Sequence, residues 1–135
     1  MGEYSKTVII NGDPQLILIR SKKYWIDNKY EAVEESFTRK TTYFLAFTKG
    51  KPSRNLYGFS LERAYSQLFI KMVTDKSANV CSIEVFINFP WLLLSRNDIK
   101  SIESKVETFL TWITISVWKN PSPSVEESEK INKNN

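Results

Sequence analysis

The chain has 135 residues, of which 41% are hydrophobic and 25% are charged, and its formal net charge is +4. These values are typical of one folded domain and exclude disorder over most of the chain. The sequence has no histidine and a single cysteine, Cys81. This excludes Ser–His and Cys–His nucleophile pairs, an intramolecular disulfide and a conventional zinc site within the chain. We therefore predict no catalytic, cofactor-binding or metal-binding residues.

The cellular location is predicted from two further features. The first residues contain no basic stretch followed by an apolar run, so we expect no secretory signal. The longest apolar run covers residues 91–94, which is far too short to cross a bilayer. We expect a cytoplasmic protein with no membrane partner.

The N-terminal part of the chain predicts a β-hairpin followed by a helix. Residues 7–10 and 16–19 are apolar or β-branched, and residues 11–14, with the sequence NGDP, are typical of a tight turn. Asp27 would then cap a short helix over about residues 28–37, with glutamates in its early turns.

The middle of the chain predicts a second hairpin and a helix. Residues 41–48 are aromatic and apolar on both faces of a strand. Gly50 and Pro52 break this pattern, and residues 56–59 are the expected returning strand. Apolar residues then recur at three- and four-residue steps, which predicts a helix over residues 60–75.

The C-terminal part predicts one strand and one long helix. Residues 80–87 are apolar and β-branched, and Pro90 would end that strand. Residues 98–118 carry one apolar helical stripe, although the alternation over residues 112–118 also fits a strand. We predict a helix over the whole segment.

These elements together predict an α+β fold. We expect a mainly antiparallel β-sheet of about five strands, covered by two longer helices at roughly residues 60–75 and 98–118. Residues 1–120 would form a single domain. Residues 121–135 are polar and are predicted to be a disordered tail.

Basic and aromatic residues gather in the predicted hairpin at residues 37–59, which contains no acidic residue. Cations neutralise phosphates and aromatic rings stack on bases, so this mixture suits a nucleic acid or an acidic protein. The alternative is that the rings belong to the core and the charges face water. The candidate partner-binding residues are Arg39, Lys40, Tyr43, Lys49, Lys51, Arg54 and Tyr57 of this hairpin, together with Trp91 in the apolar run at residues 89–94.

The absence of catalytic equipment favours a binding function. We predict a non-enzymatic protein-binding module, in particular an inhibitor or immunity-type protein that neutralises a toxin or enzyme by occluding its active site. Its partner would be another protein of acidic character. The alternative is a protein that binds RNA or single-stranded DNA through residues 37–59, and a third hypothesis is a metal-independent nuclease without histidine. No cofactor is expected, and the sequence does not predict an oligomeric state.

Overall fold

The computed structural model describes residues 2–38, 41–50, 66–75, 80–89 and 96–133. Within these residues, five strands form one antiparallel sheet in the order β1-β5-β4-β3-β2. The predicted α+β class with a mainly antiparallel sheet is therefore confirmed. The elements in chain order are β1 (Gly2–Asn11), α1 (Pro14–Asp27), β2 (Glu31–Thr38), β3 (Thr42–Lys49), β4 (Ser66–Asp75), β5 (Val80–Phe89), α2 (Arg96–Lys119) and α3 (Val125–Lys133).

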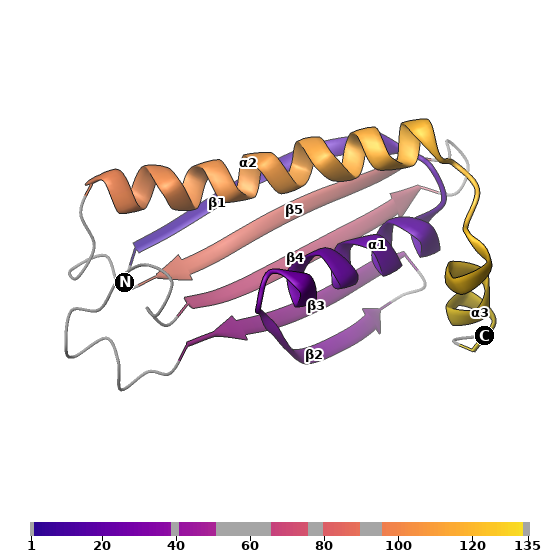
Figure 1. The fold of residues 1–135 in the computed structure, drawn as a ribbon, viewed down its shortest axis with the longest axis horizontal. Coiled ribbons are helices and arrows are strands. Elements are labelled where there is room, and N and C mark those ends of the chain that lie inside the picture. Colours follow the sequence, from indigo (N-terminus) through magenta and orange to yellow (C-terminus); the bar gives the residue numbers. More distant parts are fainter. Residues whose placement is uncertain (1, 39–40, 51–65, 76–79, 90–95, 134–135) are drawn as a thin grey trace.

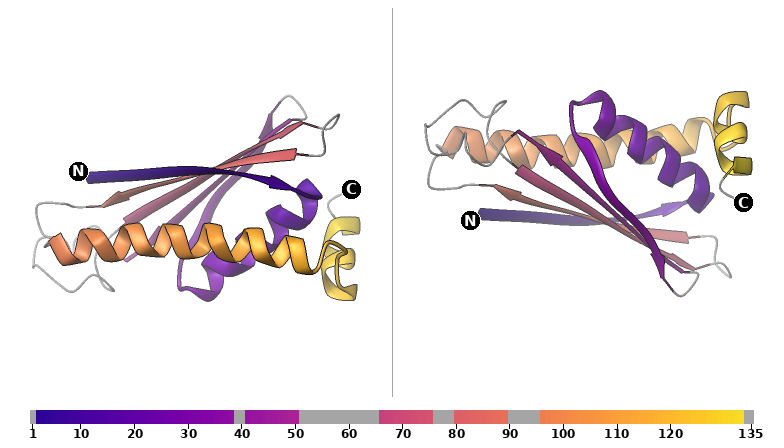
Figure 2. Two further views of the ribbon diagram at one scale, coloured as in Figure 1. Left: turned by 90° about the horizontal axis from the view of Figure 1, so that it is seen from above. Right: turned by 90° about the horizontal axis from the view of Figure 1, so that it is seen from below.

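The helices α1 and α2 cover one face of the sheet. α2 runs lengthwise past β1 and β5, and α1 lies beside it in front of β3 and β4 (Figure 1). The views from above and below show that both helices lie on the same side of the strongly twisted sheet (Figure 2). The short α3 packs against α1 near the C-terminal end of α2. Three helices therefore meet at one end of the molecule.

The core lies between the sheet and these helices. Alternate residues of β4 and β5 are buried, as expected for strands with one covered face. The helix α2 adds a buried stripe at three- and four-residue steps, which is one face of a helix. The buried residues of that stripe are Ile102, Val106, Phe109, Leu110, Ile113 and Val117.

The first predicted hairpin is wrong, because residues 16–19 belong to α1 rather than to a strand. The Asp13 side chain accepts a hydrogen bond from the backbone N–H of Gln15 at 3.0 Å, and Pro14 occupies the first turn. The NGDP segment therefore starts a helix instead of closing a hairpin. All four residues at 16–19 are buried, so packing on several sides outweighs their preference for strand.

Two predicted helices are also wrong. Residues 31–38 form the edge strand β2, and residues 66–75 form the central strand β4. In β4 the buried residues alternate, and both edges of the strand are paired, one with β3 and one with β5. The predicted returning strand at 56–59 and the start of the predicted helix at 60–65 lie outside the described residues.

The other predicted elements are confirmed, with one exception at the C-terminus. The predicted strands at 41–48 and 80–87 correspond to β3 and β5, and the long helix corresponds to α2, including residues 112–118. The predicted disordered tail is corrected, because residues 125–133 form the helix α3. None of the described helices combines the length and apolar character that crossing a bilayer requires.

The turn between β1 and α1 requires a residue without a side chain. A Cβ atom at Gly12 would lie 2.5 Å from Cγ1 of Val117, a core residue with 1% exposure. Because the β-branched Val117 has little rotamer freedom, we expect Gly12→Ala to lower the free energy of unfolding by about 1–3 kcal/mol in a urea titration. Val117→Ala should cost less in the Gly12→Ala background than in the natural chain. If Val117→Ala lowers the free energy of unfolding equally in both backgrounds, a clash between residue 12 and Val117 is contradicted.

Candidate functional site

The predicted partner-binding residues are only partly described. Arg39, Lys40, Lys51, Arg54, Tyr57 and Trp91 lie outside the described residues. The other two, Tyr43 and Lys49, lie near opposite ends of β3. The Tyr43 ring stacks on Phe37 with the ring centroids 4.2 Å apart, and its hydroxyl accepts a hydrogen bond from Gln15 Nε2 at 2.8 Å.

Tyr43 and Lys49 both make contacts that stabilise the fold. Tyr43 packs against the core from its half-buried position, and Phe47 on the same strand is 1% exposed. Lys49 Nζ lies 5.5 Å from the centroid of the buried Tyr30 ring, a cation–π distance. Tyr43 and Phe47 therefore lie on the core side of β3, in agreement with the alternative interpretation, and the structure does not bring Tyr43 and Lys49 together.

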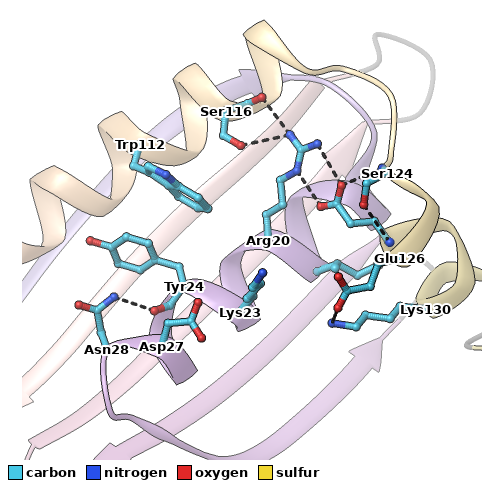
Figure 3. Close-up of a pocket in the computed structure, with 12 residues that line it drawn as sticks. Arg20, Lys23, Tyr24, Asp27, Asn28, Trp112, Ser116, Ser124, Glu126 and Lys130 are labelled. Atoms are coloured by element: carbon cyan, nitrogen blue, oxygen red, sulfur yellow. Dashed lines mark hydrogen bonds and ion pairs between the residues drawn. The ribbon is translucent and has the colours of Figure 1, made fainter.

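A different site lies where the three helices meet. A cavity of about 490 Å³ is lined by residues of α1, α2, α3 and the segment before α3, and we call it the three-helix cavity (Figure 3). Ligand pockets in proteins commonly measure about 300–1,000 Å³. The spacing of its lining residues on α1, which include Arg20, Lys23, Tyr24 and Asp27, places them on one face of the helix.

One end of the three-helix cavity is aromatic. The rings of Tyr24 and Trp112 have their centroids 5.0 Å apart, and we call these two residues the aromatic pair. Tyr24 also packs against Trp25 and Phe109, whose ring centroids lie 5.1 and 5.0 Å from its own. Burial raises the pKa of Tyr24 above its ordinary value, so its hydroxyl is neutral near pH 7. The aromatic pair is a fixed apolar surface with one polar group.

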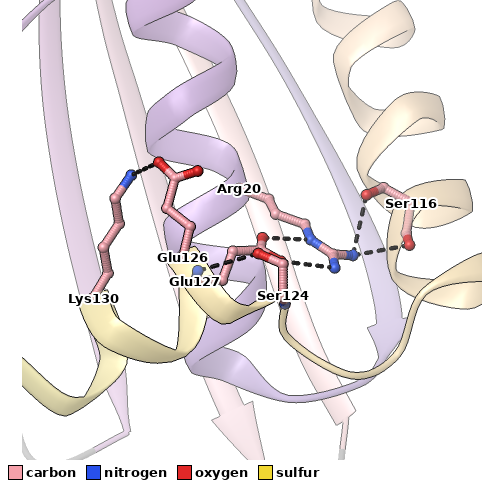
Figure 4. Close-up of polar contacts among 6 residues, drawn as sticks. All are labelled: Arg20, Ser116, Ser124, Glu126, Glu127 and Lys130. Atoms are coloured by element: carbon pink, nitrogen blue, oxygen red, sulfur yellow. Dashed lines mark hydrogen bonds and ion pairs between the residues drawn. The ribbon is translucent and has the colours of Figure 1, made fainter.

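The other end of the cavity is held by Arg20 (Figures 3 and 4). Its Nε and Nη2 donate to the two carboxylate oxygens of Glu127 at 2.8 and 3.2 Å. Its Nη1 donates to the carbonyl oxygen and to Oγ of Ser116 at 2.9 and 3.1 Å. A bidentate guanidinium–carboxylate pair is among the strongest charged contacts in proteins. Arg20 on α1 therefore ties α2 and α3 together.

Glu127 also forms the cap of α3. Its backbone N–H donates to Ser124 Oγ at 3.1 Å, and its carboxylate accepts from the Ser124 N–H at 3.0 Å. This is a capping box, in which each residue satisfies a free group of the other at the first turn. The hydrogen bonds from Arg20, followed by those from Ser124, lower the pKa of Glu127 to about 2.

The remaining charges of the cavity differ in their pairing. Glu126 and Lys130 form an exposed ion pair along α3 at 3.7 Å (Figure 4). Lys23 and Asp27 also line the cavity, and neither forms an ion pair within the part of the chain that the structure describes. No group of three potential metal ligands occurs among the described residues.

Reasoning from the sequence missed the three-helix cavity. One signal for it was present, since Ser124 and Glu127 have the S-x-x-E spacing of a capping box. That spacing indicates the start of a helix in the segment that we predicted to be disordered. No local pattern pointed to the partner of Arg20, which is 107 residues away.

Comparisons with known proteins bear on the predicted function. No family model and no curated protein matches the chain. Among solved structures the chain is similar to the crystal structure of Ara h 8.0201, with a TM-score of 0.46 and 12% identity over 88% of this chain and 99% of that chain. None of these comparisons supports the predicted inhibitor or immunity-type function or its nucleic-acid-binding alternative, and both are withdrawn. The predicted acidic protein partner stays a prediction.

Proposed function

We propose that this protein binds a small aromatic molecule in the three-helix cavity and catalyses no reaction on it. The observation that carries this proposal is the aromatic pair at one end of a cavity of about 490 Å³ whose other lining groups are mostly charged or polar. Small-molecule sites in proteins are concave, and they use aromatic side chains for contact area and converging polar groups for orientation.

The aromatic pair determines the class of ligand. Trp112 is 39% exposed, so a ring placed against it would remove apolar surface from water. Aromatic rings favour offset or edge contacts, worth about 0.5–1.5 kcal/mol beyond their buried area. Because Tyr24 is already held by two core rings, a ligand would not have to order it, and pre-ordered sites bind more tightly.

The chemical groups of the chain support binding rather than catalysis. Histidine is absent from the chain. The pKa of Glu127 is lowered to about 2, so this carboxylate is a poor base near pH 7. Burial raises the pKa of the Cys81 thiol to about 11, which disfavours the thiolate that a nucleophile needs.

We also propose a cytoplasmic location, which the single cysteine supports.

Binding can be tested by NMR with uniformly ¹⁵N-labelled protein and a panel of small aromatic compounds. We expect amide shifts to concentrate on the cavity-lining parts of α1, α2 and α3. Trp112→Ala should weaken binding at least tenfold, because interface tryptophans commonly contribute that much. The matched control is Trp118→Ala, since Trp118 lies on the same helix, is 79% exposed and does not line the cavity. Equal affinities of the two variants, or shifts confined to other surfaces, would contradict the proposal.

A further inference from the structure

The three-helix cavity contains one cation and one anion that form no ion pair with any residue that the structure describes. Its lining includes the cations Arg20, Lys23 and Lys130 and the anions Asp27, Glu126 and Glu127. Two pairs form, Arg20 with Glu127 and Lys130 with Glu126. Among the described residues, Lys23 and Asp27 are left over. Both are exposed and lie four residues apart on α1.

Helix geometry explains why these two groups do not pair with each other. A cation that precedes an anion by four residues has the less favourable orientation for an ion pair along a helix. Asp27 is also the last residue of α1, where the helix dipole disfavours an anion. Neither placement stabilises the fold, so both charges are available to a ligand.

The opposite end of the cavity offers no comparable contact for an anion. Arg20 already makes four hydrogen bonds, two to Glu127 and two to Ser116. Lys130 is engaged by Glu126. The free ammonium of Lys23 is therefore the group of this cavity best suited to an anion, and Asp27 is the corresponding group for a cation.

We propose that the ligand is an aromatic α-amino acid or a zwitterion of the same form. Its ring would lie on the aromatic pair, its carboxylate would bind Lys23, and its ammonium would bind Asp27. This inference rests on the proposed function and specifies its ligand. The lining has three formal cations and three formal anions, and a molecule with no net charge suits that balance better than a simple anion.

The spacing of the two groups matches such a head group. Side chains four residues apart on a helix have Cβ atoms about 5–6 Å apart. A hydrogen bond between an ammonium and a carboxylate spans about 2.8 Å. An α-amino acid carries its ammonium and its carboxylate on the same carbon atom, so one head group can contact Lys23 and Asp27 together. Tyr24 lies between them in the sequence and lines the same cavity, which places the ring site beside the head-group site.

Isothermal titration calorimetry on the full chain with four matched compounds tests this inference. L-tryptophan carries both charges, indole-3-propionate only the anion, tryptamine only the cation, and indole neither. We expect L-tryptophan to bind at least tenfold more tightly than each of the other three. Lys23→Met should weaken L-tryptophan and indole-3-propionate about tenfold and leave tryptamine unaffected. Asp27→Asn should weaken L-tryptophan and tryptamine and leave indole-3-propionate unaffected.

The control is Lys22→Met, because Lys22 is the neighbouring residue, pairs with Glu35 at 2.8 Å and does not line the cavity. It should leave all four affinities unchanged. If indole binds as tightly as L-tryptophan and both charge variants behave like this control, recognition of a zwitterion is contradicted. The proposal that an aromatic ring binds in the cavity is then retained. Failure of all four compounds to bind overturns the inference, and the NMR panel then decides separately on the proposed function.

Discussion

Arg20→Met is expected to lower the free energy of unfolding by about 3–5 kcal/mol, because removing one partner of a buried ion pair leaves the other charge uncompensated. The Arg20 and Glu127 side chains are only 10% and 18% exposed. The substitution keeps the aliphatic bulk and removes four hydrogen bonds to α2 and α3. Urea titration measures the total loss. Hydrogen exchange of the α3 amides measures how much of this loss comes from detachment of α3 from α1 and α2.

Two variants serve as controls for this result. Arg20→Met combined with Glu127→Gln removes both charges and should recover part of the stability, since an uncharged pair leaves no buried ion. Glu126→Gln breaks the exposed pair with Lys130 on the same helix and should cost only about 0.3–0.5 kcal/mol. A loss in Arg20→Met no larger than that of Glu126→Gln would show that the ion pair does not hold the three helices together.

The same ion pair determines how α3 responds to acid. The pKa of Glu127 in the folded chain is about 2, below its ordinary value of 4.5. Its stabilisation is therefore complete above about pH 4.5 and is lost as the pH falls through about 2. We expect the α3 amides to stay protected at pH 4 and to lose protection near pH 2. In Arg20→Met the pKa should return toward its ordinary value, and the loss should begin at higher pH.

Trp25→Ala is expected to lower the free energy of unfolding by about 3–5 kcal/mol, the usual cost of removing a large aromatic side chain from a core. Trp25 is 2% exposed. Its ring centroid lies 5.1–5.2 Å from those of Tyr24, Tyr30 and Phe109. The indole therefore joins α1 to α2 and to Tyr30, the residue directly before β2. Surrounding groups cannot readily fill its volume. Urea titration measures the change.

A more conservative change at Trp25 should be much milder. Within the described part of the chain its buried Nε1 has no hydrogen-bond partner, and a buried donor without an acceptor lowers stability. Trp25→Phe removes that donor and keeps an aromatic ring, so we expect a loss of no more than about 1.5 kcal/mol. Trp118→Ala, at a position that is 79% exposed, should change stability by less than about 0.5 kcal/mol. Trp25→Phe as costly as Trp25→Ala would contradict this account.

The sequence by itself determined the fold class and the elements whose pattern favours one interpretation over most of their length. The aromatic run of β3, the β-branched run of β5 and the apolar stripe of α2 each predicted the observed structure. Residues 66–75 were different, because their apolar residues fit both helical and strand spacing. Pairing with β3 on one side and β5 on the other decided for a strand. Residues 16–19 favour a strand locally, and their burial within α1 decided for a helix.

The candidate site was decided by the tertiary structure. The capping box of Ser124 and Glu127 depends on neighbours three residues apart, so the sequence contains it. Arg20 meets Glu127 across 107 residues, and Tyr24 meets Trp112 only because α1 and α2 pack side by side. Local preferences act over a few residues, whereas a cavity forms between surfaces that are brought together by burial of the whole core. For this reason the sequence predicted the fold class and some of the elements, and only the packing of the elements placed the charges and rings of the three-helix cavity together.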